Sequence, residues 1–253
     1  MTNRVLITGA TGGVGRALVE AYQGPHNDLA LHYRSDEALA LVLASQAIKA
    51  GSRAAAFGFD FAEAADDEHF AHFLAKVHNE IGAPNIAILN AADQSVIAWD
   101  ELKAADWDSM YRSTFRASAI LLGQIGQTMR QLPNENRVVI LVGSVEGLRP
   151  AASHAPYATM KAALHHLVLA AAHELGQFGI RVVGVAPGLI DREGLDGDWP
   201  EGYERWNRVA ALGRPVTAQE VARTIEFLTS EAASGITGVV LPVDAGWSAH
   251  PGW

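Results

Sequence analysis

The chain has 253 residues, 49% of them hydrophobic and 19% charged, which gives ample apolar surface for a folded core and little sign of disorder. Its formal net charge of −9 argues against a nucleic acid or an anionic membrane as the main partner, because both favour a basic face. The sequence contains no cysteine, which excludes disulfides, thiolate catalysis and cysteine zinc sites. A small soluble ligand fits this composition better than a nucleic acid or a membrane does.

The first residues run directly into a strand pattern and show no secretory leader, and no stretch approaches the roughly 20 apolar residues of a membrane span. We therefore expect a cytoplasmic protein. Short β-branched runs then alternate with longer helical segments. The strands are expected at 4–9, 28–33, 53–59, 85–91, 137–144, 181–188 and 238–244, and the helices at about 13–23, 36–50, 63–82, 101–132, 156–178 and 217–230.

Alternation of this kind requires parallel strands joined by crossover helices, and strands this apolar are covered on both faces. The sequence predicts an α/β fold: a Rossmann-type, doubly wound sheet of seven mostly parallel strands with helices on both faces, in a single domain over 1–253. Ligands of such sheets bind beyond the carboxyl ends of the strands. Residues 189–216 interrupt the alternation of strands and helices, and we expect them to form a substrate lid.

A glycine-rich turn follows the first strand in LITGATGGVGRAL. Gly9, Gly13 and Gly15 allow a sharp turn and the close approach of a ligand, and the N-terminus of the next helix favours a pyrophosphate. A tight turn without a ligand would use the same residues, but the place of this turn at the first strand-to-helix junction favours a dinucleotide. The spacing TGxxxGxG, which starts at Thr8, resembles the short-chain dehydrogenase/reductase family.

A tyrosine and a lysine stand four residues apart in YATMK, so Tyr157 and Lys161 can point from one helix into one cleft. A nearby cation favours the phenolate, so we expect Lys161 to lower the pKa of Tyr157 from about 10 toward the working pH. Ser144 ends the fifth strand and its hydroxyl could hold a carbonyl oxygen. Each residue alone has an ordinary structural explanation, but together they resemble the catalytic set of the family.

The second strand ends in HYRSD, where Tyr33 stands near the place of the acidic residue that binds the ribose of NAD. Arg34 follows and can pair with a 2′-phosphate, so we predict NADP(H), with NAD(H) the less favoured cofactor. An ordinary solvated arginine is the alternative. In many relatives that use NADP a second basic residue precedes the middle glycine of the loop, and Gly12 occupies that place here.

The resemblance covers nearly the whole chain and implies further cofactor contacts. Asp60 matches the family's adenine-binding aspartate, although it could also cap the next helix. The fourth strand ends in LNAAD where the family usually shows NNAG, and VAPGLI resembles the PG motif that meets the nicotinamide. The cofactor-binding residues implied in this way are Gly9, Thr11, Gly13, Val14, Gly15, Arg34, Asp60, Phe61, Asn90, Ala91, Ala92, Tyr157, Lys161, Pro187, Gly188 and Ile190.

Two departures from the family stand out. Thr114 occupies the place of an asparagine that anchors a water in a proton relay, and its shorter hydroxyl could still bind a water. We therefore count Thr114 with Ser144, Tyr157 and Lys161 as catalytic. Arg192 replaces a threonine that often follows the PG motif.

Within the expected lid, Trp199, Tyr203, Trp206 and Ala210 follow a helical spacing. They could line a site for an apolar or ring-bearing substrate, but packing against the body or a neighbouring subunit would give the same pattern. His154 lies close to Tyr157 in sequence, and a loop histidine without a role is the interpretation we favour.

No metal site is expected. His69 and His72 lie one helical turn apart, but no third ligand is evident. His165 and His166 are adjacent and so face different directions on their helix.

The resemblance implies an NADP(H)-dependent oxidoreductase that interconverts a carbonyl and an alcohol by hydride transfer, with Tyr157 as acid and base. Reductases of 3-oxoacyl thioesters, small ketones and sugars share the pattern. The alternative is a catalytically weak dinucleotide-binding sensor. Only Thr114, which replaces the asparagine of the proton relay, favours this alternative. Family members commonly form tetramers, so we expect a homo-oligomer, tetramer or dimer, that acts on a small carbonyl or alcohol and binds neither nucleic acid nor membrane.

Overall fold

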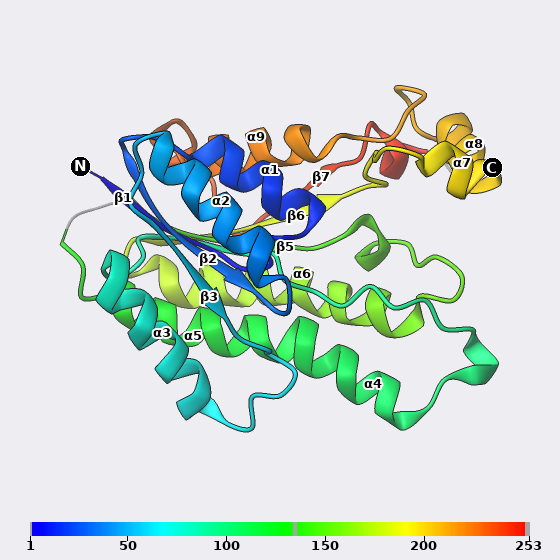
Figure 1. Cartoon of the computed structure of the whole chain (residues 1–253). Helices are drawn as coiled ribbons and strands as arrows, with labels where there is room; N and C mark the ends of the chain where they lie inside the picture. The colour runs from blue at the N-terminus through cyan, green and yellow to red at the C-terminus, as the bar shows by residue number, and fades with distance from the viewer. Residues whose placement is uncertain (1, 134–135, 251–253) are drawn as a thin grey trace.

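A computed structural model describes residues 2–133 and 136–250 of the chain (Figure 1). Its seven strands form one sheet in the order β3-β2-β1-β4-β5-β6-β7, and every neighbouring pair is parallel. The strands are β1 (Asn3–Ile7), β2 (Asn27–Tyr33), β3 (Ala54–Gly58), β4 (Ile86–Leu89), β5 (Arg137–Val142), β6 (Ile180–Pro187) and β7 (Val240–Val243). The strand order reverses between β1 and β4, as a doubly wound sheet requires. The predicted fold class is confirmed.

Helices cover both faces of the sheet (Figure 1). One face carries α1 (Gly13–Tyr22), α2 (Glu37–Lys49) and α9 (Ala218–Thr229), and the other carries α3 (Asp67–Ile81), α5 (Ala117–Met129) and α6 (Ala155–Gly176). Alternate residues of β1 serve the two cores: Val5 and Ile7 pack with α1, α2 and α9, whereas Leu6 packs with α3, α5 and α6. Each core therefore holds its own set of helices in place.

The segment expected as one helix over 101–132 is divided in the structure. A 3₁₀ turn, η1 (Trp99–Glu101), precedes α4 (Ala104–Met110), and a π-helical turn, η2 (Tyr111–Arg116), joins α4 to α5. Within this stretch the hydroxyls of Ser113 and Ser118 bond to backbone carbonyls four residues earlier, and Thr114 Oγ1 accepts the N–H of Asp93. These side-chain bonds compete with the regular helical pattern, which hydrophobic spacing alone does not reveal.

The third helix also begins later than expected, at Asp67, because Asp66 caps it. The Asp66 carboxylate accepts the N–H groups of Glu68 and His69. Asp60 therefore does not cap this helix, and its carboxylate instead accepts the N–H of Ala62 at 2.9 Å.

Residues 189–216 form a separate lobe beyond the carboxyl end of β6. They contain α7 (Leu195–Asp198) and α8 (Pro200–Val209), which lie at one end of the molecule (Figure 1). The lobe is closed at its base, where Ile190 pairs in parallel with Val216 and the Asp191 N–H donates to the Val216 carbonyl at 2.7 Å. No helix within the described ranges has the length and hydropathy of a bilayer span.

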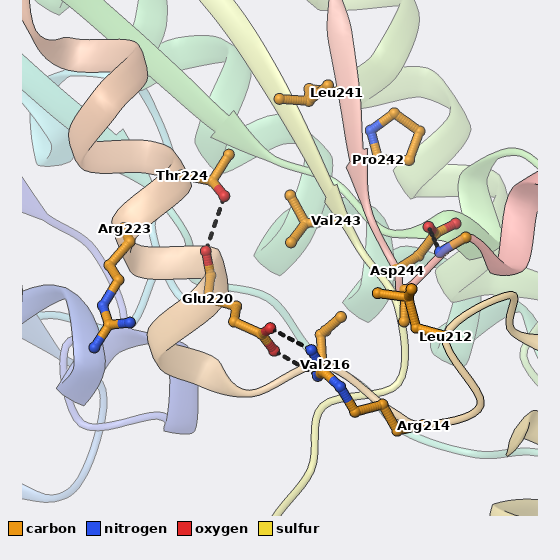
Figure 2. Close-up of a pocket in the computed structure, with 12 residues that line it drawn as sticks. Leu212, Arg214, Val216, Glu220, Arg223, Thr224, Leu241, Pro242, Val243 and Asp244 are labelled. Carbon is orange, nitrogen blue, oxygen red and sulfur yellow. Dashed lines mark hydrogen bonds and ion pairs between the residues drawn. The ribbon is translucent and has the colours of Figure 1, made fainter.

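A groove of about 450 Å³ opens at the free edge of the sheet between α9, β7 and residues 212–216 (Figure 2). Arg214 and Glu220 form a forked ion pair across it, with N–O distances of 2.7 and 2.9 Å. None of the residues that line this groove belongs to the predicted catalytic or cofactor set. Two lining residues, Val216 and Val243, nevertheless contact Ile190 and Gly188 of that set through their backbones.

Two histidines lie inside the fold. His32 near the end of β2 and His165 in α6 are 2% and 9% exposed. Burial lowers the pKa of each to about 4, and the charge of Lys161 adds to the effect on His165. Both histidines are therefore neutral in the folded protein near pH 7.

We expect the free energy of unfolding to fall as the pH decreases from about 6.5 to about 4. In that window the unfolded chain binds a proton on His32 that the folded protein excludes, so stability present above the ordinary pKa is lost. A shift from 6.5 to about 4 corresponds to roughly 3 kcal/mol. Urea unfolding at a series of pH values should show a shallower decline for His32→Asn than for the wild type, and equal slopes would contradict this assignment.

Candidate active site

The topology brings the predicted motifs to one edge of the sheet. Gly9 follows β1, Asn90 follows β4, Ser144 follows β5 by two residues, and Gly188 follows β6. Because β1, β4, β5 and β6 are adjacent and parallel, their carboxyl ends meet at this edge, next to the point where the strand order reverses. The strands therefore gather residues that are as much as 179 positions apart in the sequence.

The glycine loop is held tightly from both sides. Gly9 has a φ of +65°, which favours glycine, and its N–H donates to His32 Nδ1 at 3.0 Å. Its carbonyl accepts a hydrogen bond from Asn90 Nδ2 at 3.2 Å. A Cβ atom on Gly15 would lie 2.1 Å from the Gly9 carbonyl oxygen, so α1 can approach the loop this closely only with glycine there.

The start of α1 is suited to an anion. Gly12 is its N-cap and provides no side-chain hydrogen bond, so first-turn N–H groups at Gly13 and Val14 remain available to a ligand. The carbonyl of Gly12 accepts the N–H of Arg16, which starts the helix in the normal way. These backbone groups fit a pyrophosphate.

The expected adenosine side of the site lies at the ends of β2 and β3. Arg34 is exposed and pairs with no acidic residue in the described part of the chain, so its guanidinium is available to a phosphate. The Tyr33 ring lies against Gly58, where an added Cβ would be 2.8 Å from the hydroxyl oxygen. Asp60 is half-buried beside Phe61, which is 5% exposed.

Three predicted catalytic residues lie together after β5 and on α6. Ser144 is the N-cap of a 3₁₀ turn, η3 (Val145–Gly147), and its hydroxyl oxygen accepts the N–H of Glu146 at 3.1 Å. Tyr157 and Lys161 are 7% and 2% exposed on the first turns of α6. Lys161 Nζ donates to the Val142 carbonyl at 2.7 Å and lies 5.5 Å from the centre of the Tyr157 ring.

Burial, and not the lysine, dominates the acidity of the tyrosine. It raises the pKa of Tyr157 to about 12; hydrogen bonds with the Ser144 and Gln94 side chains lower this pKa and the negative charge of Glu146 raises it. Burial also lowers the pKa of Lys161 to about 7. The expectation that Lys161 brings the pKa of Tyr157 toward neutrality is not met in this structure, because burial of the phenol raises that pKa and Lys161 does not offset it.

The Thr114 hydroxyl already has two partners. It accepts the N–H of Asp93 at 3.2 Å and lies 3.5 Å from the sulfur of Met110, and the residue is fully buried. Thr114 therefore anchors the loop after β4 to the π-helical turn. Its part in a proton relay stays a prediction.

His154, for which we favoured a loop histidine without a role, pairs with Glu146 beside Tyr157, and the sequence did not point to Glu146. Both carboxylate oxygens of Glu146 are 2.9 Å from His154 Nδ1, and the His154 ring meets the Tyr157 ring edge-on at 5.9 Å. Together with Gln94, whose side chain bonds to the Tyr157 hydroxyl, they make one side of the space around the phenol polar. Their places two residues after Ser144 and three before Tyr157 were the available signal, but the contact between them is tertiary.

The lobe of residues 189–216 packs on the body through Trp206. Its ring stacks on Trp247 at 5.1 Å and its indole N–H donates to the Arg214 carbonyl at 3.2 Å. The same ring lies against Gly188, where a Cβ would be 2.7 Å away. Trp206 therefore packs against the body, whereas Trp199 is 51% exposed, and a place for either in a substrate site stays a prediction.

The residues after β6 also have defined partners. The Gly188 N–H donates to the Val243 carbonyl at 2.9 Å, and Ile190 belongs to the bridge at the base of the lobe. Arg192, the second departure from the family pattern, forms an exposed ion pair with Asp198 at 2.7 Å. Both partners of this pair belong to the lobe.

The remaining histidines show no metal site within the described residues. His69 lies 2.7 Å from the Asp66 carboxylate at the start of α3. His165 is buried and His166 is exposed, so the two do face different directions as expected. The Nε2 atom of His165 lies 3.5 Å from the Ser144 N–H.

Known proteins resemble this chain over nearly its whole length. A family model described as enoyl-(acyl carrier protein) reductase matches residues 9–248. The 3-oxoacyl-[acyl-carrier-protein] reductase FabG of Aggregatibacter actinomycetemcomitans is 30% identical over 249 residues, which are 97% of this chain and 99% of that protein.

Solved structures are also similar to this chain over nearly its whole length. A short-chain dehydrogenase/reductase from Serratia marcescens has a TM-score of 0.88 at 27% identity, over 97% of this chain and 98% of its own. A blue fluorescent protein from a metagenomic library, in complex with NADPH, has a TM-score of 0.87 at 25% identity, with coverage of 97% and 98%. Together with the motifs at the sheet edge, these matches show that the chain belongs to the short-chain dehydrogenase/reductase family of oxidoreductases.

Proposed function

We propose that the protein is an NADP(H)-dependent oxidoreductase that interconverts a carbonyl and an alcohol, with Tyr157 as the acid and base. The observation that carries the proposal is the gathering of Ser144, Tyr157 and Lys161 at the sheet edge that also holds the glycine loop. When bound, the nicotinamide cofactor supplies or accepts the hydride.

The residues have distinct tasks in this proposal. Ser144 holds the substrate oxygen by a hydrogen bond, and Tyr157 gives that oxygen a proton in reduction or takes one in oxidation. With a pKa of about 12, Tyr157 carries its proton at neutral pH and is suited to act as the acid. Lys161, whose amine donates to the Val142 carbonyl beside the phenol, would hold the nicotinamide ribose.

The cofactor would be held by residues already brought to this edge. The start of α1 fits the pyrophosphate, and Arg34 is available for a 2′-phosphate. A preference for NADP(H) draws support from the NADPH complex of the structurally similar fluorescent protein. The remaining contacts that we propose are those of Thr11, Val14, Asp60, Phe61, Asn90, Ala91, Ala92, Pro187, Gly188 and Ile190.

The substrate would approach from the side of Gln94, Glu146 and His154. These polar side chains favour a substrate that carries a second hydrogen-bonding group near the reacting carbon. A 3-oxoacyl thioester meets that requirement, and the similar FabG protein is a reductase of that class. The lobe of residues 189–216 would cover the substrate as a lid.

A homo-oligomer and a cytoplasmic location belong to the same proposal. The free edge of the sheet exposes apolar side chains at Val239 and Leu241 of the last strand region, and Phe227 of α9 is 47% exposed nearby. Exposed apolar surface of this kind favours association.

Replacing Tyr157 by phenylalanine should lower kcat/KM by about 10²- to 10⁴-fold, because the proton donor is lost while the ring still packs. Turnover of a panel of ketones and 3-oxoacyl thioesters with NADPH, followed by absorbance, measures this change. Tyr22→Phe removes a buried phenol hydroxyl that contacts Thr229 far from the site and is the control. Tight NADPH binding without turnover in the wild type, unaltered by Tyr157→Phe, would favour the sensor alternative.

Replacing Arg34 by alanine should weaken NADPH binding by on the order of tenfold or more and leave NADH binding nearly unchanged, because only NADPH carries the 2′-phosphate. Fluorescence titration with each cofactor gives both dissociation constants. Arg223→Ala removes an exposed arginine on α9 and is the matched control. Equal weakening of both cofactors would refute the assignment.

Replacing Glu146 by glutamine should shift the pH dependence of alcohol oxidation toward lower pH. The negative charge of Glu146 raises the pKa of Tyr157, so its removal lets the phenol lose its proton more readily. The profile of kcat/KM against pH measures the shift, with Glu68→Gln on α3 as control. An inflection that does not move would contradict the influence of Glu146 on Tyr157.

A further inference from the structure

We infer that His32 is a positioning residue for the dinucleotide, because it ties the glycine loop after β1 to the loop after β3. The inference rests on the proposed function, in which these two loops hold the pyrophosphate and the adenosine. It concerns how the site is held in shape, and His32 itself is too deeply buried, at 2% exposure, to touch the cofactor.

The two ring nitrogens of His32 bond to different loops. The N–H of Gly9 donates to Nδ1 at 3.0 Å, and Nε2 lies 2.8 Å from the carbonyl oxygen of Phe59. A backbone N–H can only donate and a carbonyl can only accept, so the neutral ring carries its proton on Nε2. One side chain thus fixes the first glycine of the loop and the residue just before Asp60.

Two phenylalanine rings also pack against the imidazole of His32. Phe61 stacks on it at 4.1 Å with an interplanar angle of 24°, and Phe73 of α3 meets it edge-on at 5.6 Å. Phe61 follows Asp60 directly, so the same histidine contacts both sides of the proposed adenine-binding aspartate. The imidazole therefore sets the distance between the two loops.

Gly9 depends on this contact because its position leaves few alternatives. Its carbonyl is taken by Asn90, its φ is positive, and the loop is closed against α1 by Gly15. Without an acceptor from β2, the Gly9 N–H would be left unpaired in the interior, and the loop would have to move to reach water. Such a movement would displace the N–H groups at the start of α1.

Three substitutions of His32 test the contributions of its two hydrogen bonds individually. Asparagine places its amide near the position of Nδ1 and can keep the acceptor for Gly9, whereas glutamine reaches toward the position of Nε2 and can keep the donor for Phe59. Phenylalanine keeps the stacked ring and loses both bonds. Tyr22→Phe serves as control, because it removes a buried hydrogen bond to Thr229 that touches neither loop.

The experiment measures NADPH dissociation constants by fluorescence titration and amide hydrogen exchange of the glycine loop by mass spectrometry. We expect His32→Phe and His32→Gln to weaken NADPH binding by on the order of tenfold and to speed exchange in the loop, because both lose the acceptor for Gly9. His32→Asn should stay within about threefold of the wild type. KM for NADPH should rise far more than kcat falls.

Unchanged NADPH affinity in folded His32→Phe would overturn the inference, whether or not exchange is faster. Equal weakening by Tyr22→Phe would overturn it as well, since the effect would then reflect general destabilisation. The wild type decides the proposed function separately: if it binds neither NADPH nor NADH, that function fails. If it binds NADPH and the His32 variants bind equally well, only the inference fails.

Discussion

Removal of water from the space around Tyr157 and Lys161 sets the chemistry of the candidate site. Desolvation raises the pKa of the phenol to about 12 and lowers that of the amine to about 7, so both groups are pushed toward their neutral forms. At neutral pH the phenol keeps its proton, and the amine gives up its charge more readily than an exposed lysine does. Under the proposed function, the resting site therefore holds the phenol in the protonated form that can give a proton to a carbonyl oxygen.

Two neutral histidines support the two halves of this site. His32 accepts the N–H of Gly9 on the cofactor side, and His165 lies against Gly143 and Gly147 beneath the turn that carries Ser144. A positive charge on either ring would be buried, and on His165 it would also stand near Lys161. Burial keeps both rings uncharged, so each can offer an acceptor nitrogen to a backbone N–H where a lysine or arginine could not.

The fold and the main motifs could be predicted from sequence because they depend on local patterns. Apolar runs mark strands, and the glycine loop, Tyr157 and Lys161 occur at fixed spacings. The missed features depend on contacts that the folded chain makes and no spacing shows. Gly9 meets His32 and Asp93 meets Thr114 from different parts of the chain, and Glu146 meets His154 across the loop before α6. Burial decides the acidity of Tyr157 for the same reason, since the degree of desolvation follows from packing and not from the YxxxK spacing.

Thr114 bonds in the structure to Asp93, the last residue of the LNAAD stretch where the family usually shows NNAG. Asp93 stands where the family usually has glycine, and Thr114 where it often has asparagine, and the N–H of Asp93 donates to the Thr114 hydroxyl. The Asp93 carboxylate turns to Ser95, whose hydroxyl donates to it at 2.6 Å. A threonine is short enough to be buried fully on the π-helical turn and still accept this bond. The pair therefore fixes the loop after β4 that also carries Asn90 and Gln94.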